Sequence, residues 1–159
     1  MIEAAAPEGK RHRRLIAAAA GVAALVPVYY LTDAAARFLR AGNAAFAPAP
    51  MGLACLAAVA VLVTLLTARP AAALCCGLPL AAAGVVFGLD LDTAMGAAGT
   101  LPWAREGGLP WSLPGGAPWA EPGEPPGTLA GTSGLYALIG VVLVLSALLP
   151  DRLRSMLKG

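Results

Sequence analysis

The sequence predicts an all-α, polytopic integral membrane protein with four transmembrane helices. Three observations support this class: an apolar composition, four long runs without charged residues, and basic residues gathered at matching ends of those runs. Apolar residues make up 58% of the 159 residues, and charged residues only 13%, about half the share usual in soluble domains. The mean hydropathy of +0.74 is also high for a water-exposed surface. This composition argues against a soluble enzyme, a nucleic-acid binder and a disulfide-rich secreted domain.

The four charge-free runs are the basis for the helix prediction. Spanning the hydrocarbon core takes about 20 helical residues, and a charge near its centre is costly. Backbone groups in lipid must be satisfied within their own segment, so each run is expected to be helical. We expect transmembrane helices over residues 15–32, 50–67, 71–89 and 129–150.

The connecting segments follow from these four spans. Residues 1–14 form a basic arm, and residues 151–159 form a basic tail. We expect an outer loop over 33–49, an inner link over 68–70, and a long Pro/Gly/Trp-rich extracytoplasmic loop over 90–128.

The basic residues predict the orientation. With four spans, eight of the eleven lysines and arginines fall on one side of the membrane, and six of the nine acids fall on the other. Basic residues favour the cytoplasmic side, so both termini are expected to be cytoplasmic. Arginine outnumbers lysine nine to two, which is typical of a GC-rich bacterial genome and points to the bacterial plasma membrane. An alternative is that residues 1–36 are a cleaved signal peptide, which would leave three spans.

Small residues at helical spacing predict a packing face on the third span. Association in lipid depends on close contact between small residues, because lipid removes the hydrophobic drive between helices. The spacings of four, three and four place the candidates on one face. We expect this face to meet a neighbouring helix or a second copy of the chain through Gly77, Ala81, Gly84 and Gly88.

The long outer loop contains an eight-residue repeat, which occurs three times over residues 101–124. Each unit carries Pro-Trp at its second and third positions, giving Trp103, Trp111 and Trp119. Three interpretations stay open. The tryptophans could tether the loop in the headgroup region, form a recognition platform, or belong to a tolerated duplication.

The residues that usually carry chemistry are few. His12 is the single histidine and lies in the basic arm, so a hydrolytic triad or a zinc site is not expected. The carboxylates Asp33, Asp90 and Asp92 close spans on the outer side, where we expect solvated helix ends. The sequence therefore predicts no catalytic residue, no metal site and no cofactor.

In size, the chain resembles the proton-coupled four-helix multidrug exporters, which depend on a buried carboxylate. The four predicted spans contain no charged residue, which argues against that mechanism. The favoured interpretation is a small multi-pass bacterial membrane protein, not an enzyme, with an accessory or structural role in the envelope or in a membrane complex. The alternative is a small oligomeric transporter or exporter that is not driven through a buried carboxylate. The expected partners are the lipid bilayer and other membrane proteins or further copies of itself, with no nucleic acid.

Overall fold

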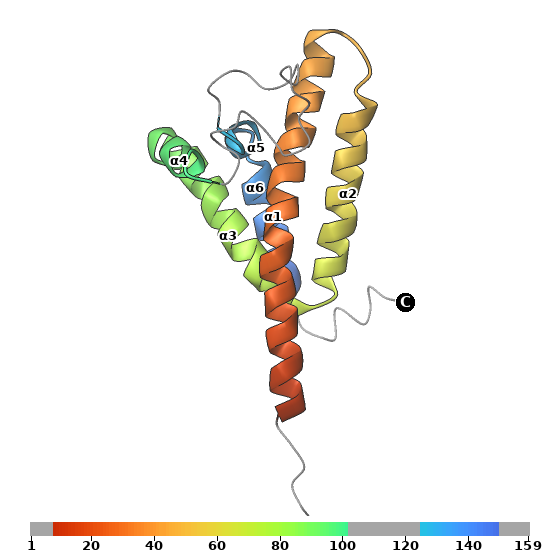
Figure 1. The fold of residues 1–159 in the computed structure, drawn as a ribbon, viewed down its shortest axis with the longest axis vertical. Helices are drawn as coiled ribbons and strands as arrows, with labels where there is room; N and C mark the ends of the chain where they lie inside the picture. The colour runs from red at the N-terminus through yellow and green to blue at the C-terminus, as the bar shows by residue number, and fades with distance from the viewer. Residues whose placement is uncertain (1–7, 102–124, 150–159) are drawn as a thin grey trace, which may run out of the picture.

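The structure, a computed structural model, describes residues 8–101 and 125–149, which form six helices and no strand (Figure 1). Helix α1 (Glu8–Ala44) has 37 residues, which corresponds to about 55 Å. Helix α2 (Pro50–Thr67) returns beside α1, and the two form an antiparallel hairpin. Helix α3 (Pro70–Leu89) follows after a short link and crosses α1.

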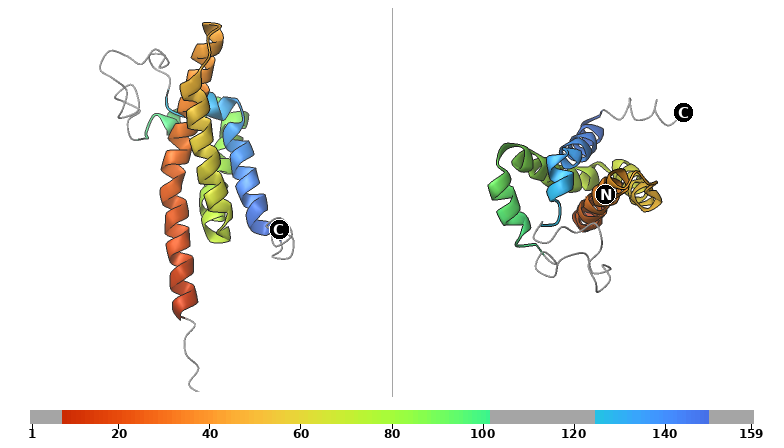
Figure 2. Two further views of the ribbon diagram at one scale, coloured as in Figure 1. Left: turned by 90° about the vertical axis from the view of Figure 1, so that its right-hand side faces the viewer. Right: turned by 90° about the horizontal axis from the view of Figure 1, so that it is seen from above.

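Three shorter helices complete the described chain. Helix α4 (Leu91–Ala98) turns away from the end of α3, and α5 (Thr128–Thr132) lies near α1 and α3. Helix α6 (Leu135–Leu148) packs antiparallel to α3, in the most extensive helix contact of the structure. Figure 2 shows that the N-terminal part of α1 extends beyond the other helices.

Local sequence explains where these helices begin. Pro50 and Pro70 stand in the first turns of α2 and α3, where proline's fixed φ suits a helix and its missing N–H is not needed. Gly127 and Gly134 precede α5 and α6 with φ of 92° and 76°, a left-handed conformation that glycine adopts readily. The left-handed turn at Gly134 divides the predicted fourth span into two helices.

Two segments expected as loops contain helix. The segment 33–49, expected as a loop, is helical up to Ala44. The helix continues because Asp33 and Arg37 pair with each other at i,i+4 spacing instead of ending it in solvent. The start of the segment 90–128 likewise forms a helix, α4, which Asp90 caps.

Three helices are long and apolar enough to cross a membrane: Arg14–Ala44 within α1, and the whole of α2 and α3. Helix α6 is apolar but has only 14 residues. The all-helical class and several candidate spans thus agree with the sequence prediction. Helix α6 alone is shorter than the candidate spans, so a fourth crossing would need α5 and α6 together.

Side-chain size is distributed inside out relative to a water-soluble bundle. Among the described residues, eight of the seventeen buried hydrophobic residues are alanine, whereas leucine, isoleucine and valine dominate the exposed large ones. Leu53, Leu65 and Leu138, for example, are each more than 60% exposed. Small residues allow helices to approach closely, and large exposed apolar side chains need an apolar surrounding.

Candidate functional site

The most structured polar feature joins α1 to the segment before α5. It consists of Asp33, Arg37, Pro125, Thr128 and Ala130, and we call it the polar cluster. The Nε of Arg37 donates to the Asp33 carboxylate at 2.7 Å, and an Nη of Arg37 donates to the Pro125 carbonyl at 3.0 Å. The Thr128 hydroxyl donates to the same carbonyl at 2.8 Å, and the Ala130 N–H donates to Asp33 at 3.5 Å. The side chains of Asp33, Arg37 and Thr128 thus each have a hydrogen-bond partner.

Burial makes this cluster unusual. Asp33 is 4% exposed and Arg37 is 7% exposed. A buried charge is costly unless a countercharge and hydrogen bonds compensate it. Both conditions hold here, because the ion pair is completed by a backbone carbonyl and a backbone N–H from the segment before and within α5. The cluster therefore fastens α5 to α1.

Two tyrosines, Tyr29 of α1 and Tyr136 of α6, connect α1 to α6 beside this cluster. The rings of Tyr29 and Tyr136 stack with centroids 4.7 Å apart and planes 12° apart. The Tyr29 hydroxyl donates to the Pro126 carbonyl at 2.8 Å, and the Tyr136 hydroxyl donates to the Tyr29 carbonyl at 3.0 Å. Tyr136 is fully buried. Burying these large rings together with their hydroxyls is favourable because each hydroxyl has an acceptor.

The prediction that Asp33 is a solvated helix end was wrong, since its carboxylate is buried and paired. The chain does contain a buried carboxylate, so the sequence argument based on its absence does not hold. This carboxylate is paired with Arg37 at 2.7 Å. In the described ranges, no three His, Cys, Asp or Glu residues lie close enough together to hold a metal ion.

Sequence reasoning placed Asp33 at a helix end and missed the cluster. One signal was available, namely the i,i+4 spacing of Asp33 and Arg37, which brings opposite charges together on a helix. Pro125, Thr128 and Ala130 gave no such signal, because they approach α1 only through the tertiary fold.

The predicted packing face of α3 lies largely against α6. A Cβ added at Gly77 would lie 2.8 Å from the Cβ of Leu143, and one added at Gly84 would clash with the backbone of Ala137. Ala81 is in equally close contact with Gly140, since a Cβ added at Gly140 would clash with the backbone of Ala81. Three of the four predicted residues therefore share one interface.

Gly88 is separate from that interface. A Cβ added at Gly88 would meet no atom within 4 Å. Gly140 is the partner residue that sequence analysis did not single out; a lone glycine inside an apolar helix was its only signal. Trp103, Trp111 and Trp119 lie outside the described residues.

Asp90 connects α3 to α4 through its side chain. The carboxylate accepts hydrogen bonds from the Thr93 hydroxyl at 2.5 Å and from the Thr93 N–H at 3.1 Å. These hydrogen bonds stabilise the charged form and hold the pKa of Asp90 below its ordinary value. Asp90 is thus an N-cap whose strength depends on its charge.

The protection of α4 amides against hydrogen exchange is expected to fall in acid. A lowered pKa means that the charged cap stabilises α4 above the ordinary aspartate value of about 3.9, and that this stabilisation is lost as the pH falls through the lowered value. Exchange in Leu91–Ala98, corrected for the intrinsic rate at each pH, measures the effect in detergent micelles. Asp90→Asn keeps an acceptor at the cap and should lack the acid step; an identical step in this variant would contradict the assignment.

An apolar cavity of about 450 Å³ lies between α1, α3 and α4. Its walls are aliphatic and aromatic, and they include Leu25, Tyr30, Pro79, Phe87 and Leu101. No charged side chain is among its lining residues in the described part of the chain. The cavity is therefore suited to an apolar molecule.

Comparisons with protein-family models, curated proteins and solved structures find no match to this chain. The fold itself defines the class: a small all-helical protein with three helices able to cross a membrane.

Proposed function

We propose that the protein is a four-span bacterial plasma-membrane protein, with both termini cytoplasmic and a non-catalytic accessory or structural role. The observation that carries this proposal is the inside-out distribution of side chains, with alanine and glycine between the helices and large aliphatic side chains outside. Lipid is the surrounding that suits such a surface. The lipid bilayer is therefore the first partner, and other membrane proteins or further copies of the chain are the candidates for the second.

The fourth crossing is proposed for α5 and α6 together. Helix α6 follows α3 from Ala137, which faces Gly84, to Leu143, which faces Gly77. Helix α5 continues this course at the other end of α3, where Gly131 lies against Phe87. The two helices thus accompany most of α3, and α3 is itself long enough to cross.

The non-catalytic role is supported by how the polar groups are used. The buried ion pair and both tyrosine hydroxyls are engaged in holding helices together. In residues 8–101 and 125–149, every buried side-chain nitrogen and oxygen has a hydrogen-bond partner. A reactive site commonly needs a polar group poised for substrate, and these groups are committed to structure.

A transporter is the second candidate, and the apolar cavity between α1, α3 and α4 favours it. Pro79 lines this cavity from inside α3, where it removes one helical hydrogen bond. The substrate would be apolar, in keeping with the walls. Faster movement of a lipophilic dye across vesicles containing the protein than across protein-free vesicles would favour the transporter.

Two introduced cysteines are expected to label from opposite sides of the membrane. In a background with Cys55, Cys75 and Cys76 changed to alanine, Ser112→Cys should react with a membrane-impermeant maleimide on intact cells. Ser155→Cys should react only after the cells are opened, because α5 and α6 would separate the two positions.

Two alternative topologies give different labelling patterns. Labelling of both positions on intact cells would show that α5 and α6 do not cross, leaving three spans. Protection of Ser112→Cys with exposure of Ser155→Cys would show the inverted orientation. The accessory role is tested by mild-detergent purification from the native host, and recovery of a lone monomer would contradict it.

A further inference from the structure

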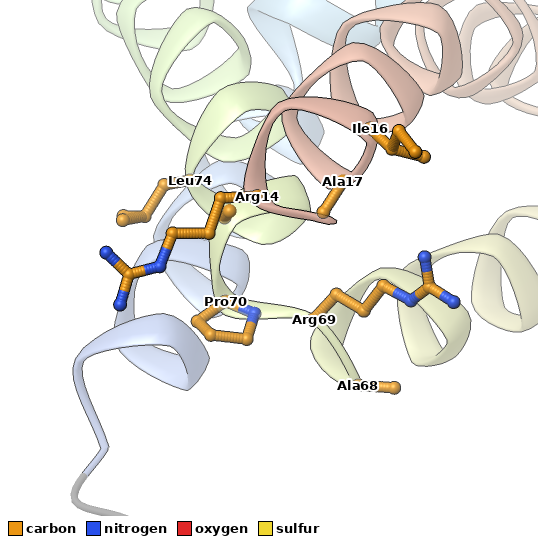
Figure 3. Close-up of a pocket in the computed structure, with 8 residues that line it drawn as sticks. Arg14, Ile16, Ala17, Ala68, Arg69, Pro70 and Leu74 are labelled. Carbon is orange, nitrogen blue, oxygen red and sulfur yellow. The ribbon is translucent and has the colours of Figure 1, made fainter. Parts of the chain in front are cut away.

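A second hollow lies at the basic end of the bundle, where α1 passes the link between α2 and α3. Figure 3 shows this groove, which has a volume of about 770 Å³. Arg14 from α1 and Arg69 from the link stand on either side of it, with Ala17 and Pro70 between them, and their exposed guanidiniums point away from each other. Its lining residues are Arg14, Ile16, Ala17, Ala68, Arg69, Pro70, Ala71 and Leu74.

The charge of the groove is one-sided. Arg14 and Arg69 are both exposed, and no hydrogen bond or ion pair occupies either guanidinium in the described part of the chain. No acidic residue is among the lining residues. Two uncompensated guanidiniums bordering one groove favour an anion, and the planar donors of arginine match phosphate oxygens well.

The rest of the groove is apolar. Ile16, which is 50% exposed, lines the groove together with Ala17, Pro70, Ala71 and Leu74. A free phosphate ion would leave this wall uncovered. A molecule with an anionic head and a hydrocarbon chain covers both parts at once.

We propose that this groove binds one anionic phospholipid of the cytoplasmic leaflet. The exposed side chains of Arg14 and Arg69 would turn toward its phosphate, and an acyl chain would lie along the apolar lining. This inference rests on the proposed membrane insertion and orientation. Anionic lipids concentrate in that leaflet, and basic pockets between transmembrane helices hold their headgroups. A zwitterionic lipid fits less well, since its cationic group would be repelled by the two arginines.

The test uses the full-length protein in mild detergent, with bound lipid counted by native mass spectrometry during titration with phosphatidylglycerol. Replacing both arginines, in R14Q/R69Q, is expected to weaken binding about fivefold for each lost charge, or about twenty-five-fold together. Phosphatidylcholine should bind the parent protein as weakly as phosphatidylglycerol binds the double variant. R14K/R69K keeps both charges and should retain most of the affinity.

Arg40→Gln is the matched control, because Arg40 is an exposed arginine near the other end of α1. Equal phosphatidylglycerol affinity in R14Q/R69Q and R40Q would overturn the proposal. Displacement of the lipid by millimolar inorganic phosphate would also overturn it, because the groove would then be a phosphate site. Failure of membrane insertion is detected separately, as release of the protein from membranes by alkaline washing.

Discussion

Gly84→Leu is expected to separate α6 from α3 and to lower the free energy of unfolding by at least about 3 kcal/mol. The reason is geometric. A Cβ at this position would clash with the backbone nitrogen of Ala137 and lie 2.7 Å from its Cα. Backbone atoms cannot move aside as a flexible side chain can, so the helices must part and their contacts are lost.

The chain supplies a matched control four residues away on the same helix. Gly88→Leu introduces the same side chain where no atom lies within 4 Å of the new Cβ, and it should change stability by less than about 1 kcal/mol. Cys76 provides the measurement, because it is fully buried in α3 and its thiol reacts only when the bundle opens. Maleimide labelling of Cys76, with Cys55 and Cys75 changed to alanine, reports the opening equilibrium. Equal labelling rates in the two leucine variants would contradict the close α3–α6 contact.

Arg37→Met is expected to destabilise the bundle by about 3–5 kcal/mol, the usual cost of leaving one partner of a buried ion pair uncompensated. Asp33 would remain as a buried charge with a single long hydrogen bond from the Ala130 N–H. The Pro125 carbonyl would keep the Thr128 hydroxyl as a donor, so the loss falls mainly on the carboxylate.

Removing both charges should recover most of this loss. In Asp33→Leu/Arg37→Met, no buried charge is left, and apolar replacement of a buried pair is often close to neutral. Arg40→Met is the control for losing an exposed arginine one turn further along α1, and it should destabilise the bundle by less than about 1 kcal/mol. The same Cys76 labelling assay compares all three variants. A double variant as unstable as Arg37→Met would show that the cluster acts through something other than charge pairing.

The helices over residues 50–67 and 70–89 were predictable because the sequence marks their ends. Proline starts each one, and Arg69 and Asp90 interrupt the apolar runs at their boundaries. Charge-free length alone then predicts a helix in lipid. The contact face of α3 was also predictable. Glycine and alanine at helical spacing form a face on which another helix can approach closely.

The features that escaped prediction depend on residues far apart in the chain. Charge was taken as the end of the first helix, whereas the fold buries Asp33 and Arg37 under a segment almost 90 residues later. The break at Gly134 was likewise hidden inside an apolar run, where hydropathy is insensitive to a left-handed turn. Tertiary partners decide the burial of Asp33 and Arg37, and neither hydropathy nor the length of a charge-free run reports that burial or the break at Gly134.

Asp33 and Arg37 stand on one helix, whereas their partners Pro125 and Ala130 come 88 and 97 positions after Arg37 and Asp33, respectively. During translation, α1 is therefore complete long before those partners leave the ribosome. Because they are four residues apart on one helix, the carboxylate and the guanidinium can pair before their later partners exist. Formation of the ion pair thus needs only α1, whereas its burial needs α5, so the two events are separable along the chain.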